Sequence, residues 1–349
     1  MLTNPTGSNF VRGIISAVVD KAGWNGKLAY DIAVFEQDEA HAVHFAKVVR
    51  PRGVLVLNIM RDQMDRFGEI DTTLKLLETL ARSATEYVVL SANDERVSTI
   101  LVGDDVKTVW YAHSADLQAE FLTDDQLYHA ETVTYALGGE PDVLLTGYDE
   151  ASVSVSIHGT PHRYRYQLQG GHNALNLTAA LTVLYQVVPA PDTTKLAEAI
   201  LTVEPAFGRG EVIDVPGGGK LTLQLVKNPG GFTQALRMLD LKSYTTIGIA
   251  INDDYPDGRD VSWLWDVSFE SLQRPVLCGG VRAADMANRL KYDGVKTVAA
   301  YEDLGEYVTA LNERAATDGG EAILFCTYTA MLKIRSVYLG IYSGLGDEA

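Results

Sequence analysis

Short runs of β-branched and other apolar residues alternate along the chain with longer stretches in which apolar residues recur at helical spacing. Four of the short runs end abruptly at polar residues: DIAVFEQDE, GVLVLNIMRD, TEYVVLSANDE and KTVWYAHS. Between them lie stretches such as IDTTLKLLETLARSA, whose period is that of an amphipathic helix. Strands that alternate with helices are typical of βαβ units. The pattern therefore predicts a mostly parallel sheet with helices on both faces.

The pattern changes between about residues 112 and 165, where VTYALGG, DVLLTGYD and SVSVSIHG resemble short antiparallel hairpins. They predict a β insertion in the first domain. A helical pattern resumes at GGHNALNLTAALTVLYQVV, and PGGGK after Val215 indicates a linker. A second α/β unit follows, with strands expected at LTLQLVKNPGG, TTIGIAINDD, PVLCGG and AILFCTYTA. We therefore predict two α/β domains, residues 1–212 and a smaller Rossmann-like domain over 213–349, joined near 208–220.

Composition narrows the class of protein. A chain of 349 residues is longer than most single cores, which agrees with two domains. With 29 basic and 46 acidic residues the net charge is −17, which argues against nonspecific binding to nucleic acid or anionic lipid. There is no apolar run of membrane length and no signal-peptide pattern, so we expect a cytoplasmic protein. Cys278 and Cys326 lie in apolar runs and are expected to be buried structural thiols.

Polar residues follow most of the expected strands, and ligands of open α/β sheets bind at the carboxyl ends of the strands. Carboxylates and amides there suit Mg²⁺ with phosphate oxygens, and basic side chains suit phosphate or carboxylate. Together they predict a nucleotide, a metal and an anionic substrate between the domains. For any single residue, capping a helix or satisfying a loop remains an open alternative. The residues are Glu36, Asp38, Glu39, Asn58, Arg61, Asp62, Asn93, Asp94, Lys227, Asn228, Asn252–Asp254, Arg282 and Thr327–Thr329.

No phosphate-loop motif G-x-x-x-x-G-K-[ST] occurs in these residues. GGGK, at 217–220, is followed by Leu221 and an expected strand instead of by Ser or Thr and a helix.

A series of motifs occurs in an order that resembles the Mur ligases. These are NPTGSNFVRGI, VFEQDEA, NIMRDQMDRFGEID, GGHNALNLTAA, PAFGRGE, VKNPGGFTQALR, NDDYPDGRDVSWLWD, RAADMANRLKY and TYTAML. DGRDVSWLWD and RAADMANRLKY are similar to the MurT-like subunits of lipid II isoglutaminyl synthases. The resemblance implies amidation of the D-glutamate α-carboxylate of lipid II in peptidoglycan synthesis. It also implies ATP, Mg²⁺, ammonia from a GatD-like glutamine amidotransferase, and a substrate at the membrane surface.

The resemblance assigns roles to individual residues. Glu36 matches the family's magnesium-binding glutamate, and Gln63 stands where many Mur ligases carry a metal-binding histidine. Two alternatives stay open: Asn176 could pack on a loop, and Arg209 could form an ion pair with Glu211. The residues expected to contact ATP are Asn173, Asn176, Arg209 and Lys227.

The stretch YPDGRDVSWLWD, residues 255–266, holds two of the four tryptophans among three aspartates. The resemblance implies that Asp260 completes a Cys-His-Asp triad whose Cys and His belong to the GatD-like partner. Asp257 and Asp266 are alternative candidates. Trp263 and Trp265 are then expected to face or support the partner. The competing hypothesis is a structural junction, with tryptophan in the core and aspartate as a cap.

Two departures from the family pattern matter. The region expected to hold a four-cysteine zinc ribbon has no cysteine, and His129, His158 and His162 lack zinc-site spacing, so no zinc is expected. The family's phosphate loop precedes NPTGSN, and here that motif lies near residue 1. We therefore expect weak ATP binding, and self-association through an unpaired edge near residues 32–35. A noncatalytic scaffold, a split-gene fragment, or another Mur-type amino-acid ligase remain alternatives.

Overall fold

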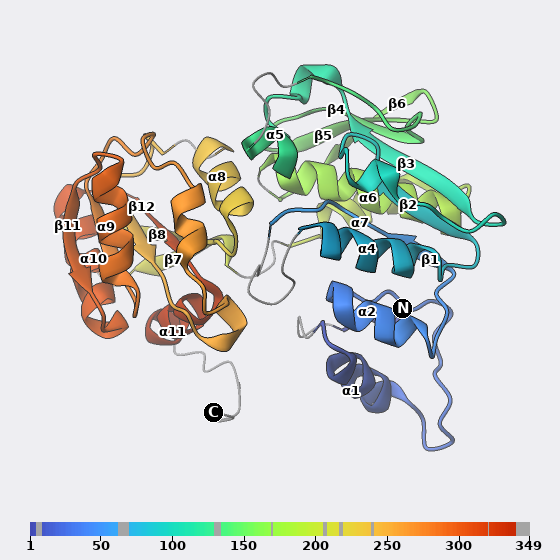
Figure 1. Ribbon diagram of the computed structural model, residues 1–349, viewed down its shortest axis with the longest axis horizontal. Helices are drawn as coiled ribbons and strands as arrows, with labels where there is room; N and C mark the ends of the chain where they lie inside the picture. The colour runs from blue at the N-terminus through green and yellow to red at the C-terminus, as the bar shows by residue number, and fades with distance from the viewer. Residues whose placement is uncertain are drawn as a thin grey trace.

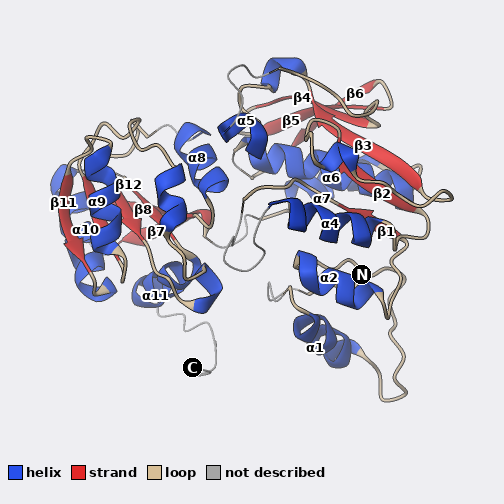
Figure 2. Cartoon of the chain, viewed as in Figure 1, coloured by secondary structure: helices blue, strands red, loops and turns tan. Residues whose placement is uncertain are grey.

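The computed structural model describes residues 1–4, 9–61, 70–128, 134–168, 170–204, 208–215, 219–238, 241–319 and 321–339. Two six-stranded sheets, each packed against helices, form two lobes (Figures 1 and 2). The two-domain α/β architecture predicted from the sequence is confirmed. None of the described helices is long and apolar enough to cross a membrane.

The first sheet has the order β1-β2-β3-β4-β5-β6. Its strands are β1 (Gly53–Leu55), β2 (Tyr87–Ser91), β3 (Lys107–His113), β4 (Val143–Tyr148), β5 (Ser152–Ile157) and β6 (Thr160–Arg165). The first four run parallel, and β5 and β6 continue the same sheet antiparallel to their neighbours. The expected β insertion at about 112–165 is therefore wrong in one respect: β4 pairs with β3, and its hairpins extend the central sheet. They share its core, because Val143 and Val155 pack with α6 residues such as Leu181.

Alternating side chains of this sheet are covered by helices on opposite faces. Val88 and Leu90 pack with α4 (Ile70–Ala81), whereas Val89 packs with α6 (Gly171–Val187). This alternation follows from the two-residue period of a strand. The remaining elements of this lobe are α1 (Val11–Lys21), α2 (Glu39–Ala46), η1 (Val97–Thr99), η2 (Ala115–Leu117), α5 (Asp124–Tyr128) and α7 (Thr193–Leu201).

The stretch DIAVFEQDE forms no strand among the described residues, which corrects the first expected strand. Its pairing is a single bridge between Leu2 and Ala33. The backbone N–H of Leu2 donates to the carbonyl of Ile32 at 2.9 Å, and the carbonyl of Leu2 accepts from the N–H of Val34 at 2.9 Å, so the segment near Ala33 is partnered by the start of the chain. The edge strands of the sheet are β1 and β6, and residues 32–35 do not form the expected strand edge.

The second sheet has the order β11-β10-β9-β12-β8-β7, and all its neighbours are parallel except β7 and β8. The strands are β7 (Arg209–Val215), β8 (Gly219–Leu225), β9 (Thr246–Ala250), β10 (Val276–Gly279), β11 (Thr297–Tyr301) and β12 (Ala322–Cys326). Residues 216–218 of the predicted linker PGGGK lie outside the described residues. On its two sides Val215 pairs with Gly219, so β7 and β8 form an antiparallel pair and the chain here does not join two domains. This sheet begins at Arg209, so the expected boundary at 212/213 falls inside β7.

Helices cover both faces of the second sheet (Figure 1). One core joins the sheet to α8 (Pro229–Met238) and α9 (Ala283–Tyr292), and the other joins it to α10 (Leu304–Asp318) and α11 (Tyr328–Leu339). Cys278 in β10 and Cys326 in β12 are free and buried, as predicted. Two short helical turns, η3 (Tyr255–Asp257) and η4 (Ser262–Asp266), follow β9.

Candidate functional site

The second sheet has a topological switch point between the neighbouring strands β9 and β12. The chain leaves β9 toward the face covered by α8 and α9, because Leu264 of η4 packs in that core. It leaves β12 into α11, which covers the opposite face. Ligands of open α/β sheets bind in the crevice at such a point. The stretch YPDGRDVSWLWD begins at this edge of the sheet.

A buried hydrogen-bond network closes the switch point. The backbone N–H of Asn252 donates to Thr327 Oγ1 at 2.9 Å, and Asn252 Nδ2 donates to Thr329 Oγ1 at 3.1 Å. The backbone N–H of Thr329 donates to Asp257 Oδ1 at 2.9 Å, and its hydroxyl donates to Asp257 Oδ2. Asn252 Oδ1 accepts from the backbone N–H of Val281 at 3.2 Å. The connections that leave β9, β10 and β12 are therefore joined by side chains.

Asp257 is the acid of this network, and only 5% of its surface is exposed. Burial raises the pKa of Asp257 to about 6, the two hydrogen bonds from Thr329 act against this rise, and the nearby charge of Asp254 adds to it. Both carboxylate oxygens are occupied within the chain. Asp257 is therefore placed as a structural acid and presents no free oxygen to a partner.

Asp260 lies three residues further on and is exposed. Its Oδ1 accepts the backbone N–H of Ser262 at 2.8 Å. Hydrogen bonds from the side chain and the backbone of Ser262 hold the pKa of Asp260 below its usual value. An exposed carboxylate that stays ionised is the form that can accept a hydrogen bond from an approaching imidazole. Asp266 is exposed as well.

Arg289, which sequence reasoning missed, fixes the far end of this loop. Its side chain is 8% exposed and pairs with Asp293, with Nη1 at 2.5 Å from Oδ1. The same guanidinium donates to the carbonyls of Leu264 at 3.1 Å and Val267 at 2.5 Å. Asp293 also accepts the backbone N–H of Phe269 at 2.6 Å. The motif RAADMANRLKY contained this arginine, but no local pattern indicates that it binds a loop more than twenty residues earlier.

The two tryptophans have different environments. Trp263 is partly buried, packs against the core beneath α8, and lies 6.4 Å from the ring of Phe232. Trp265 is 50% exposed and lies 5.1 Å from the ring of Tyr292, with the Arg289 guanidinium 5.3 Å away. Trp263 thus has the surroundings of a supporting core residue. Trp265 keeps the exposure that a partner-facing role requires, and that role stays a prediction.

The predicted basic residues at the carboxyl edge of this sheet differ in their surroundings. Arg282 is paired with Asp253, with Nη2 at 2.6 Å from Oδ2, so its charge is compensated within the chain. Lys227 is exposed and follows β8. Arg209 begins β7, and its side chain lies outside the described part of the structure. Glu211, the expected ion-pair partner of Arg209, binds Arg335 at 2.9 Å.

The start of α8, next to Lys227, touches the first domain. Asn228 Oδ1 accepts the backbone N–H of Gly231 at 2.7 Å and so caps the first turn of α8. A Cβ on Gly230 would lie 2.1 Å from Cε of Met60, which follows β1. The glycine of the motif VKNPGG therefore lets the carboxyl edge of the first sheet approach the second domain near Lys227.

The carboxyl edge of the first sheet holds a second buried acid, Asp94. Its oxygens accept the backbone N–H groups of Ile59 at 3.1 Å, Arg96 at 3.0 Å and Val97 at 2.9 Å. Burial raises the pKa of Asp94 to about 6 against the effect of these bonds. Arg61, another strand-end candidate, binds buried Asp124, with Nε at 3.2 Å from Oδ2. Both strand-end residues therefore bind other parts of the same domain.

The predicted magnesium and nucleotide residues of the first domain are Glu36, Asn173 and Asn176. Glu36 is exposed, and its backbone is fixed by both side-chain atoms of Asn4, at 3.1 and 2.9 Å. Asn173 and Asn176 lie on the first turns of α6, where Asn176 is exposed. One accessible carboxylate suits Mg²⁺, which keeps several waters and takes few protein ligands. Gln63 and His129 lie outside the described residues. No group of three His, Cys, Asp or Glu side chains elsewhere in the described chain is placed to hold a metal.

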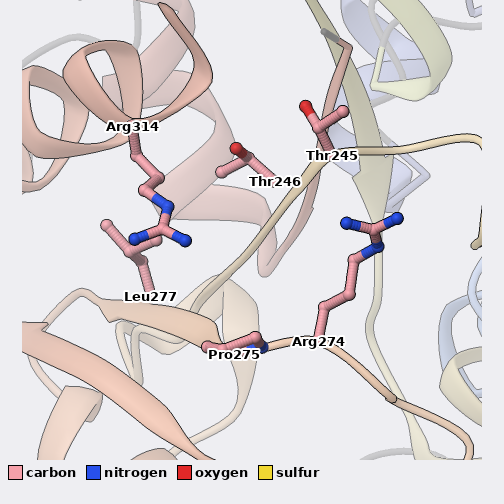
Figure 3. Close-up of a pocket in the computed structure, with 6 residues that line it drawn as sticks. All are labelled: Thr245, Thr246, Arg274, Pro275, Leu277 and Arg314. Atoms are coloured by element: carbon pink, nitrogen blue, oxygen red, sulfur yellow. The ribbon is translucent and has the colours of Figure 1, made fainter. Parts of the chain in front are cut away.

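A hollow of about 220 Å³ lies at the opposite, amino-terminal edge of the second sheet (Figure 3). Thr245 and Thr246 at the start of β9 line it, together with Arg274 and Arg314. None of the residues predicted from the sequence to act in catalysis or binding reaches it. The switch point and this hollow are therefore separate features.

Two family models match the chain. The Mur ligase middle domain matches residues 25–184, and the MurT ligase C-terminal domain matches residues 225–331. The second range contains the whole switch-point network and the stretch YPDGRDVSWLWD.

Known proteins are similar over most of the chain. The lipid II isoglutaminyl synthase (glutamine-hydrolyzing) subunit MurT of Streptococcus pneumoniae is 29% identical over 370 residues, covering 97% of this chain and 80% of that protein. MurF from Acinetobacter baumannii has a TM-score of 0.70 at 15% identity, covering 97% of this chain and 70% of that chain. MurF from Thermotoga maritima in complex with ADP has a TM-score of 0.63 at 15% identity, covering 90% of this chain and 68% of that chain. At such low identity the two structures show the fold alone.

Proposed function

Because the chain belongs to the Mur ligase family and carries a MurT-type C-terminal domain, we propose that it is the ligase-like subunit of a lipid II isoglutaminyl synthase. In this role it amidates the α-carboxylate of D-glutamate in the lipid II stem peptide to D-isoglutamine. It uses ATP together with ammonia released from glutamine by a GatD-like amidotransferase subunit.

The reaction has two chemical steps. A carboxylate is a poor electrophile, so the γ-phosphoryl group of ATP is first transferred to it, which gives an acyl phosphate and ADP. Ammonia then attacks the acyl carbon, a proton is lost, and inorganic phosphate leaves as the amide forms. Such phosphoryl transfer depends on positioning and charge neutralisation. Asn173, Asn176, Arg209 and Lys227 are the residues proposed to hold the nucleotide, and Glu36 would hold Mg²⁺, which neutralises phosphate charge when bound.

The observation that carries the proposal is the position of Asp260. It is an exposed, ionised carboxylate inside the part of the chain that matches the MurT C-terminal domain. The loop around it is fixed on both sides, by Asp257 and by Arg289. Asp260 is proposed to orient the histidine of the partner's glutaminase site. A ligase that adds an amino acid has no need for such a group, so this loop favours the amidating subunit over a Mur-type amino-acid ligase.

The test is amidation of purified lipid II by this chain and a GatD-like glutaminase, with ATP and Mg²⁺. We expect amide formation with glutamine only when the partner is present, and amide formation with ammonium chloride when it is absent. ADP should appear in equal amount to amide. An amino acid joined to the substrate would establish the amino-acid ligase instead. Lack of ADP release with either nitrogen source would establish the noncatalytic scaffold.

A further inference from the structure

We infer that Asp257 is a positioning residue, which fastens the loop carrying Asp260 to the first turn of α11 through Thr329. The inference rests on the proposed function for its catalytic consequence, but the anchoring itself is a property of this chain. Asp257 does not act on substrate or on the partner's histidine in this scheme. Its effect is to hold Asp260 where that histidine arrives.

The anchor consists of two hydrogen bonds to one residue. Thr329 donates its backbone N–H to Asp257 Oδ1 at 2.9 Å and its hydroxyl to Asp257 Oδ2. The Thr329 hydroxyl can donate only one hydrogen bond, and its oxygen accepts another from Asn252 Nδ2 at 3.1 Å. Thr329 therefore has a fixed hydrogen-bond direction, from Asn252 through Thr329 to Asp257. The start of the loop cannot move without breaking bonds that are shielded from water, where they are costly to lose.

The backbone conformation after Asp257 links the position of this anchor to the position of Asp260. Gly258 follows at once, with φ of 84° and ψ of 135°, a region that residues with a side chain rarely adopt. The chain therefore leaves the anchor in a direction that only glycine permits. Asp260 lies two residues beyond this turn. A shift of the Asp257 backbone therefore reaches Asp260 across only two residues, Gly258 and Arg259.

The second fixed point lies beyond Asp260. Arg289 holds the carbonyls of Leu264 and Val267, and Leu264 is buried. Between the two fixed points, Asp260 is held by its own bond to the backbone of Ser262. Loss of the Asp257 anchor would thus free one end of the segment and leave the other in place. The fold would survive, and the position of Asp260 would become less defined.

Matched substitutions at Thr329 test the anchor. Thr329→Val keeps the shape and the backbone N–H but removes the hydroxyl, whereas Thr329→Ser keeps both donors. We expect Thr329→Val to lower kcat of glutamine-driven amidation by about tenfold or more, since small misplacement of a catalytic group is costly. Ammonia-driven amidation should stay within about twofold, because it bypasses the glutaminase step. Thr329→Ser should resemble the wild type in both reactions. Equal loss in both reactions, or no loss with Thr329→Val, would overturn the inference.

Hydrogen exchange gives a reading that needs no activity. In Thr329→Val, backbone amides of residues 258–262 should exchange at least about threefold faster than in the wild type, with amides of β9 and β12 unchanged. Asp257→Asn, which keeps one acceptor oxygen and loses the other, should act in the same direction if the valine variant does not fold. Unchanged exchange in the loop overturns the anchor even if the chain amidates lipid II. If exchange is faster in Thr329→Val but the wild-type chain does not amidate lipid II, the anchor is supported and only the proposed function is contradicted.

Discussion

Asp94 and Asp257 occupy corresponding places in the two sheets, but their partners differ. Each lies in a loop that leaves the carboxyl edge of a sheet, each is almost fully buried, and burial raises the pKa of each to about 6. Asp94 accepts three backbone N–H groups from its own lobe, two of them within the next three residues. Asp257 accepts from Thr329, 72 residues away, and precedes an exposed carboxylate.

The comparison shows that burial and a raised pKa do not by themselves identify a catalytic acid. Perturbed acids occur at functional sites and in structural networks alike. What differs is the segment that each acid holds. Asp94 joins the segments that follow β1 and β2, which stabilises the sheet edge. Asp257 holds the loop that carries the ionised, exposed carboxylate of Asp260.

The largest expected effect is on glutamine-driven amidation, and it distinguishes the exposed Asp260 from the buried Asp94 and Asp257. Asp260→Asn should lower glutamine-driven amidation by about a thousandfold or more, as loss of a triad carboxylate does, and leave ammonia-driven amidation within about twofold. Initial rates with the two nitrogen sources measure this. Asp266→Asn, at an exposed position of the same loop, is the matched control. If Asp266→Asn has the large effect instead, the triad role belongs to Asp266, and equal loss in both reactions would make Asp260 part of the ligase site.

Asp94→Ala should have the largest effect on stability. Removing its carboxylate leaves the N–H groups of Ile59, Arg96 and Val97 without their acceptor, which is expected to lower the free energy of unfolding by about 2–4 kcal/mol. Urea unfolding measures the change. Asp104→Ala, at an exposed position, should stay within about 0.5 kcal/mol of the wild type. A similarly small change in Asp94→Ala would contradict the structural role given to Asp94.

The pH dependence of stability should reveal the buried charge of Asp257. Its folded pKa of about 6 lies above the ordinary value of 3.8, so the folded protein binds the proton more tightly than the unfolded chain. Asp257 therefore contributes less to stability as the pH rises through about 6, by at most about 1.4 kcal/mol per pH unit.

The free energy of unfolding of wild type minus that of Asp257→Asn should accordingly fall as the pH rises from about 4 to about 6, and level off at higher pH. Denaturant unfolding across the range measures the difference. A difference that rises with pH would mean that Asp257 is stabilised as an anion and has a lowered pKa.

The smallest expected effect is that of metal removal, which should leave both sheet edges unchanged. Cys278 and Cys326 are buried in different strands, so thiolate ligands for a structural zinc are not provided. We expect far less than one zinc per chain by elemental analysis, and a change in Tm of less than about 1 °C with a chelator. Stoichiometric zinc, with a Tm that drops on chelation, would contradict this expectation.

Much of the fold follows from local pattern. Runs such as TEYVVLSANDE and AILFCTYTA became β2 and β12, because short apolar runs between helical stretches are typical of strands buried on both faces of a parallel sheet. DIAVFEQDE had the same appearance but pairs only at Ala33. DVLLTGYD and SVSVSIHG became β4 and β5, whereas VTYALGG forms no strand over its described residues, 134–139. The pairing of β4 with β3 in the central sheet was not predicted. Pairing between distant segments leaves no local signal in either case.

The sequence by itself determined which chemistry is available: the order of motifs, the aspartates of YPDGRDVSWLWD, and the absence of a cysteine cluster. Only the tertiary structure decided which aspartate is exposed to solvent and which has both carboxylate oxygens hydrogen-bonded within the chain. Asp257 and Asp260 differ little in sequence context, but Thr329, 72 residues away, donates to Asp257 and accepts in turn from Asn252. The physical reason is that burial and hydrogen bonding depend on neighbours in space. The parallel pairing of β9 with β12 fixes those neighbours, and Arg289 fixes the far end of the loop, and no local pattern encodes either arrangement.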